Sequence, residues 1–86
     1  MKGLLNKVKN RYTRQRFVVS TIRKGEDDFE TAVFAASLLY IPKSLSNPDL
    51  TVRTQNREEA WDMHYQITAR LTQEYPARLF QEFEQN

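Results

Sequence analysis

The stretch Arg-Phe-Val-Val-Ser-Thr-Ile-Arg, residues 16–23, decides the fold class, because its β-branched residues favour an extended strand. It ends at Lys-Gly-Glu-Asp-Asp, residues 24–28, a cluster of residue types that form turns. Beyond this cluster, Phe-Glu-Thr-Ala-Val-Phe-Ala, residues 29–35, resumes a strand-like pattern. The three segments together predict a β-hairpin.

The segments after the hairpin predict one more strand. We expect residues 36–41 to continue the second strand, although so short an apolar run would also fit a turn of helix. Two prolines with Ser, Asn and Asp make residues 42–49 a loop. Residues 50–53, Leu-Thr-Val-Arg, then fit a short third strand, and three strands under a covering helix is about the smallest sheet that is stable alone.

A long helix is predicted from about Arg57 to Glu74. Asn-Arg-Glu-Glu, residues 56–59, matches a capping box, with Asn56 or Thr54 accepting from the first-turn amides. The apolar residues of this helix fall on two adjacent stripes, which predicts contacts on two sides, one of them with the sheet. Pro76 then begins a second short helix.

The chain before the hairpin predicts a short basic helix. Leu4, Leu5, Val8 and Tyr12 stand at helical spacing, and basic residues occupy the other sides. We therefore expect an α+β protein with a basic N-terminal helix or arm over residues 1–15 and a single α+β domain over residues 16–86.

Composition argues against several classes of function. The 86 residues suffice for one domain, and the chain has no Cys and one His. A disulfide framework, a thiolate zinc site and a cysteine nucleophile are excluded, and we expect no metal and no cofactor. His64 has acidic neighbours in sequence but no aligned nucleophile, so we expect a buried structural histidine and a non-enzymatic protein. The longest apolar run, residues 33–41, is far shorter than the roughly 20 residues of a membrane span.

Charge is segregated along the chain. Residues 1–24 hold eight bases and no acid, a net +8. The remaining five of the thirteen bases stand against all eleven acids, so residues 25–86 carry −6. Such polarity predicts an electrostatic role for the first segment.

Two sets of residues are candidates for binding. Bases interleaved with aromatic residues suit phosphate contacts and stacking, so one set is predicted to bind nucleic acid or an acidic partner: Lys2, Lys7, Lys9, Arg11, Tyr12, Arg14 and Arg16. The alternative is that these bases answer the acidic remainder of the same chain or of neighbouring copies. The aromatic residues of the two helices are predicted to form a protein interface: Trp61, Tyr65, Leu79, Phe80 and Phe83.

Two short motifs resemble a known group of proteins. Phe-Glu-Thr-Ala-Val-Phe, residues 29–34, and the run from Thr54 to His64 are similar in order to the Tyr-Glu-Thr-Met-Val-Phe strand, Thr-x-x-Glu-Ala helix start and Gly-His pair of small tailed-bacteriophage proteins. Phe29 replaces the Tyr, Ala32 the Met and Met63 the Gly. The resemblance implies a phage-encoded protein with a hairpin-plus-helix fold, found in the virion or the host cytoplasm, without catalytic residues.

The leading hypothesis is a non-enzymatic, phage-type accessory or virion-associated protein that binds a larger phage or host protein assembly, with self-association as a further expectation. One alternative is a small nucleic-acid-binding protein that uses the basic N-terminal arm. Another is a phage inhibitor of a host protein, in which the acidic body mimics nucleic acid. No membrane partner is expected.

Overall fold

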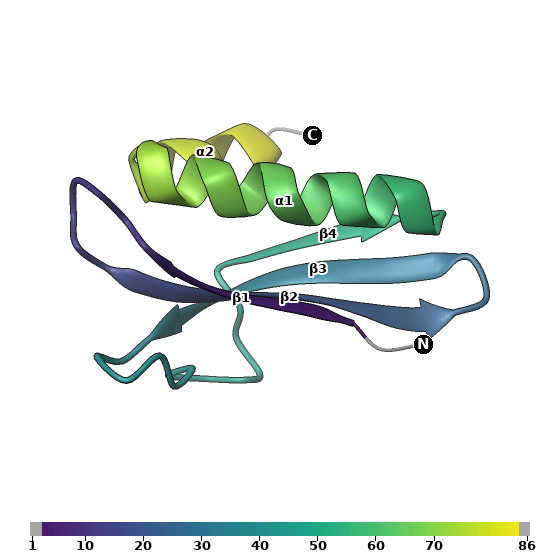
Figure 1. Cartoon of the computed structure of the whole chain (residues 1–86), viewed down its shortest axis with the longest axis horizontal. Helices are drawn as coiled ribbons and strands as arrows, with labels where there is room; N and C mark the ends of the chain where they lie inside the picture. The colour runs from purple at the N-terminus through teal and green to yellow at the C-terminus, as the bar shows by residue number, and fades with distance from the viewer. Residues whose placement is uncertain (1–2, 85–86) are drawn as a thin grey trace.

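The computed structural model describes residues 3–84 and shows a four-stranded antiparallel sheet followed by two helices (Figure 1). The strands lie in the order of the chain, and both helices cover the same face of the sheet, so no helix covers the opposite face (Figure 1). The elements are β1 (Leu4–Lys9), β2 (Arg16–Gly25), β3 (Asp28–Ala36), β4 (Leu50–Thr54), α1 (Arg57–Gln73) and α2 (Pro76–Glu84).

The central elements follow the sequence prediction. β2 and β3 form the predicted hairpin, with Arg16 opposite Ala36 and a register shift next to Gly25. β4 is the predicted third strand and pairs with β3. α1 begins at Arg57 because the side chain of Asn56 accepts a hydrogen bond of 2.8 Å from the amide of Glu59, so Asn56 is the helix cap.

The predicted N-terminal helix is wrong, because residues 4–9 form the edge strand β1, paired with β2 over its whole length. The pairing places Leu4, Asn6 and Val8 on the face covered by the helices, and Leu5, Lys7 and Lys9 on the open face. The polar side chain of Asn6 fits this inward position because its Oδ1 lies within hydrogen-bond distance, 2.7 Å, of Nε2 of His64 in α1. This polar residue in an inward position conceals the alternation that would identify a strand.

The predicted extension of the second strand through residues 36–41 is also wrong. β3 ends at Ala36, and the chain turns where the amide of Tyr40 donates to the carbonyl of Ser37 at 2.9 Å. Tyr40 has a φ of 60°, a left-handed conformation that a strand cannot contain. The chain then returns to the edge of β3, since Pro42 bridges Ala36 and the amide of Lys43 donates to Ala35. Residues 42–49 form the predicted loop.

The core lies between the sheet and the helices. α2 folds back onto it, and Phe80 packs edge-on against Phe17 with ring centroids 6.1 Å apart. The C-terminal apolar residues therefore contribute to the stability of the domain. The central buried side chains are Val8, Phe17, Val19, Val33, Leu50, Ile67, Leu71 and Leu79.

Candidate functional site

The turn between β1 and β2, residues 10–15, is fixed by the buried side chain of Asn10. Its Oδ1 accepts from the amides of Tyr12 and Thr13, both at 2.9 Å. Its Nδ2 donates to the carbonyls of Leu71 and Glu74, both at 2.5 Å, at the C-terminal end of α1. These carbonyls have no partner within the helix, so Asn10 satisfies the helix end and holds the turn in a single shape.

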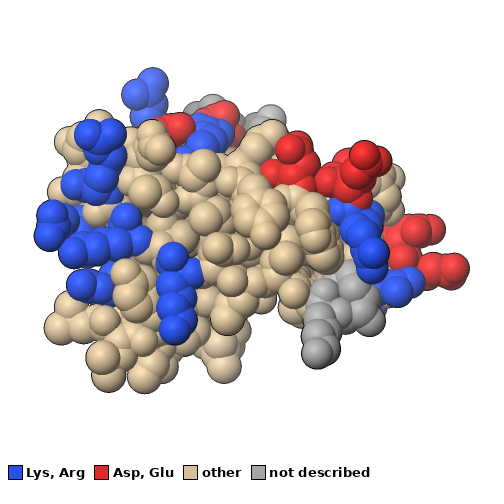
Figure 2. All heavy atoms as spheres, in the orientation of Figure 1, with Lys and Arg blue, Asp and Glu red and all other residues tan. Residues whose placement is uncertain are grey.

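This turn gathers basic side chains at one end of the molecule. Lys9 and Arg16 are cross-strand partners, Arg11 and Arg14 belong to the turn, and Lys43 comes from the loop after β3. We call these five residues the cationic end. Figure 2 shows Lys and Arg side chains gathered where the turn and the loop lie in Figure 1, and Asp and Glu gathered at the opposite end, over the β2–β3 turn and the start of α1.

The cationic end is not neutralised by ion pairs within the described part of the chain. The ion pairs within residues 3–84 lie elsewhere, at Lys24, Arg53 and Arg70, so no described carboxylate pairs with the five bases. The pKa of the Lys9 ammonium is lowered. The largest cause is the nearby guanidinium of Arg14, followed by partial burial and by the charge of Arg16. The charge predicted from the sequence is therefore concentrated in three dimensions and available to a partner.

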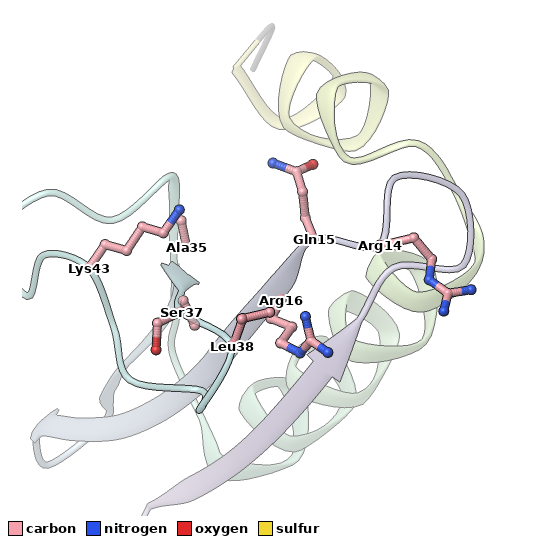
Figure 3. A pocket seen from close by; sticks show the side chains of 8 residues that line it. Arg14, Gln15, Arg16, Ala35, Ser37, Leu38 and Lys43 are labelled. Carbon is pink, nitrogen blue, oxygen red and sulfur yellow. The ribbon is translucent and has the colours of Figure 1, made fainter.

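A hollow of about 370 Å³ opens within the cationic end. In Figure 3, Lys43, Ala35 and Ser37 stand on one side of the hollow and Arg14 on the other, with Arg16 between them. The guanidinium of Arg16 lies over the ring of Tyr40, 5.6 Å from its centroid. Its Nε is buried and has no hydrogen-bond partner among the described residues.

The loop beside the hollow exposes large aliphatic side chains. Leu38, Leu39, Ile41 and Leu45 are 75%, 77%, 60% and 76% exposed. Ser37 holds this part of the loop, because its Oγ accepts from the amides of Leu39 and Ile41 at 3.3 Å. We call these four side chains the aliphatic loop. Within the described chain they form a concentrated apolar surface next to the cationic end.

The structure brings together only part of the predicted basic set. Lys9, Arg11, Arg14 and Arg16 lie in the cationic end, whereas Lys7 lies on the open face of β1 and Lys2 falls outside the described residues. Tyr12 is half-exposed and stacks on Tyr75, with ring centroids 4.6 Å apart. The guanidinium of Arg11 lies over the Tyr12 ring, 5.2 Å from its centroid.

The predicted protein interface is divided between several environments. Leu79 is fully buried, and Phe80 and Phe83 are partly buried against the core, so they pack inside the domain. Trp61 lies in the first turns of α1, edge-on to Phe29 at 6.1 Å. Tyr65 is 51% exposed on the same helix.

Sequence reasoning missed Asn10, Lys43 and the aliphatic loop. The apolar run of residues 36–41 suggested burial in a strand, and only its proximity to Pro42 hinted at a loop. Asn10 carries no signal of its own, because its helix partners lie more than 60 residues away.

His64 is buried, as predicted. Its Nδ1 lies 2.8 Å from the Oγ1 of Thr21, which in turn lies 2.6 Å from the Oγ1 of Thr31. Its Nε2 contacts Oδ1 of Asn6, and burial lowers the pKa of the imidazole. Thr31 belongs to residues 29–34 and His64 to residues 54–64, and Thr21 contacts both side chains.

Within residues 3–84, no three His, Cys, Asp or Glu side chains come together to hold a metal ion. None of the helices in this part of the chain is long and apolar enough to cross a membrane. In comparisons with known proteins, no family model, curated protein or solved structure matched the chain significantly.

Proposed function

We propose that this chain is a non-enzymatic interaction protein, of the phage accessory or virion-associated type, that docks on a larger protein assembly through the aliphatic loop. The observation that carries the proposal is the exposure of Leu38, Leu39, Ile41 and Leu45, each at 60% or more, on one short loop. Burying one such side chain against a partner contributes about 1.5–3 kcal/mol.

The construction of the loop supports this role. The amides of Lys43 and Asp49 donate to the carbonyls of Ala35 and Val33 and tie the loop to β3. The Ser37 hydroxyl accepts from the amides of Leu39 and Ile41. A surface fixed in this way loses little conformational entropy when it binds. The adjacent cationic end would select a partner with an acidic rim and speed the encounter.

The phage assignment rests on the motif resemblance, to which the structure adds one supporting fact. The two motifs, residues 29–34 and 54–64, are joined through the buried contacts of Thr21 with Thr31 and His64. The resemblance therefore includes residues with buried contacts between the sheet and α1. This is consistent with a common fold.

The test uses the double variant Leu39→Ser and Leu45→Ser. These side chains do not line the hollow, so the variant alters the aliphatic loop and leaves the cationic hollow intact. In a lysate of phage-infected cells, the wild-type chain should elute from gel filtration at a mass well above its own 10.2 kDa. Mass spectrometry should also detect it in purified phage particles. The variant should elute at its own mass.

The matched control is Leu5→Ser, which removes a 64% exposed leucine from the open face of β1 and should leave association unchanged. Elution of the wild-type chain as a monomer, or unchanged association of the double variant, would contradict the proposal.

Nucleic-acid binding is a second candidate function, favoured because no carboxylate of residues 3–84 forms an ion pair with the cationic end. Filter binding to a DNA oligonucleotide should then weaken steeply with salt, with a log–log slope of roughly 0.7–0.9 per phosphate contacted. Lack of retention at low salt would remove this candidate.

A further inference from the structure

We propose that the hollow lined by Arg14, Arg16 and Lys43 is a binding site for a phosphate group. This inference goes beyond both candidate functions, because it concerns one defined site and one ligand chemistry. It holds for a free phosphate and for a phosphate in a nucleic-acid backbone, which the experiment below distinguishes.

The charge of the hollow favours the binding of an anion. Three cationic side chains line it, Lys9 lies close enough for Arg14 and Arg16 to lower its pKa, and no carboxylate lines it. Like charges gathered without a counter-charge destabilise a fold. A phosphate monoester carries about −1.5 to −2 at neutral pH and would compensate much of this charge. A nucleic-acid strand would do so with one negative charge from each of several neighbouring phosphates.

Arg16 supplies the specific donor. Its Nε is buried without a partner, although nearly all buried polar groups in proteins are hydrogen-bonded. The Tyr40 ring limits the positions that the guanidinium can take. A planar guanidinium held in place can present two parallel N–H groups to a phosphate.

Backbone strain is concentrated around the same hollow. Arg14 has a φ of 65° and Tyr40 a φ of 60°, and they are the non-glycine residues with positive φ in the described chain. Arg14 lines the hollow, and Tyr40 lies under the guanidinium of Arg16. Such conformations cost about 1 kcal/mol or more and cluster where function requires a fixed geometry.

The remaining lining is partly apolar, with Ala35, Ala36 and Leu38 beside the polar residues Gln15 and Ser37. A volume of about 370 Å³ exceeds that of a single phosphate and lies at the low end of ligand pockets. The organic part of a phosphate ester, a sugar or a base, would rest against this apolar side while the phosphate meets Arg16.

The test is an NMR titration of the full, ¹⁵N-labelled chain with sodium phosphate, at ionic strength kept constant with sodium chloride. We expect saturable shifts confined to the amides of residues 14–16 and 35–43. Arg16→Gln and Lys43→Gln should each weaken binding about tenfold, the effect of losing one hydrogen bond to a charged group. Arg57→Gln, at the opposite end of the molecule, should bind phosphate like the wild type.

Arg14→Gly separates loss of the site from loss of the fold. Glycine adopts a φ of 65° without strain, so this variant should melt at the wild-type temperature or above it and still bind phosphate more weakly. A parallel titration with a 15-nucleotide DNA strand distinguishes the two sources of phosphate. If the DNA binds more tightly than free phosphate, with a steep salt dependence, the ligand is a backbone phosphate. If only free phosphate binds, the ligand is a small phosphate ester. Shifts spread over the whole surface, or equal affinity in all variants, would overturn the proposal.

Discussion

The Oγ1 of Thr21 lies 2.8 Å from Nδ1 of His64, buried between the sheet and α1, although 43 residues separate the two in the chain. The contact between Nε2 and Oδ1 of Asn6 requires that Nε2 carries the proton, because an amide oxygen only accepts. Nδ1 then accepts from Thr21, and Thr21 accepts from Thr31. The neutral imidazole thus links β1, β2, β3 and α1 in one directed chain of hydrogen bonds.

Stability should fall as the pH is lowered below about 6.5, because the folded state disfavours the imidazolium. Burial lowers the pKa of His64, so the unfolded chain binds a proton at a pH where the folded chain does not. Stability is complete above the unfolded pKa and declines below it, by at most about 1.4 kcal/mol per pH unit for one proton. Urea unfolding between pH 7.5 and 5.5 measures this slope.

His64→Gln is the control for this pH dependence, because the chain contains no second histidine. The variant should be less stable at pH 7.5 and nearly flat across the same range. The carboxyls whose pKa is lowered by arginine hydrogen bonds, such as Asp28 beside Arg53, titrate at lower pH and leave this range unaffected. An equal slope in both proteins would refute the assignment.

Asn10→Asp should destabilise the protein more than Asn10→Ala at neutral pH. The carboxylate keeps the acceptor for Tyr12 and Thr13 but faces the carbonyls of Leu71 and Glu74 without a donor. We expect losses of at least about 2 kcal/mol for both variants. Chemical denaturation should show partial recovery of Asn10→Asp at acid pH, where its protonated carboxyl can donate, and the absence of that recovery would count against the role of Nδ2.

Gly3→Ala should destabilise the protein by about 1–3 kcal/mol, because a Cβ at this position would stand 2.1 Å from the carbonyl oxygen of Thr21. Gly25→Ala is the matched control, since its Cβ would lie 3.6 Å from the Cβ of Asp28, an ordinary contact. The control should be neutral or slightly more stable. Thermal melting compares the two variants. Equal melting temperatures would show that the backbone at the start of β1 can move to accommodate the added methyl group.

Arg70 should couple the two helices, because it bonds to Glu74 of the α1 end and to Glu82 of α2. Its hydrogen bonds lower the pKa of both carboxyls, so the coupling is present above about pH 4.5 and is lost as the pH falls through the lowered values. A double-mutant cycle of Arg70→Met and Glu82→Gln should give a small favourable coupling at pH 7 and none near pH 2. Coupling of equal size at both pH values would exclude the ionic origin.

Much of the fold follows from local sequence patterns, whereas β1 does not. The hairpin, β4 and both helices are marked by β-branched runs, the Asn56 cap and Pro76, and these signals act over a few residues. β1 carries Asn6 at an inward position, where its partner is His64, and Asn10 follows the strand with its partners at the end of α1. In the sequence, a polar residue that is buried against a distant partner looks like a surface residue. The alternation typical of a strand is then lost, and the spacing of Leu4, Leu5 and Val8 suggested a helix instead.

The candidate site was predictable in its charge but not in its shape. The concentration of bases before residue 25 indicates a cationic surface at once. The hollow also needs Lys43 and Tyr40, which the turn after β3 brings to Arg16. The same turn exposes leucines that, as a short apolar run, suggested burial.

The bonds of Asn10 to Leu71 and Glu74 also set an order of events during synthesis. β1 and β2 are synthesised before α1 and can pair with each other, but the turn between them obtains its contacts with the end of α1 only after the chain has been made through Glu74. Until that moment the turn has only its local hydrogen bonds and its strand pairing. The cationic end therefore reaches its final arrangement only after α1 has been synthesised.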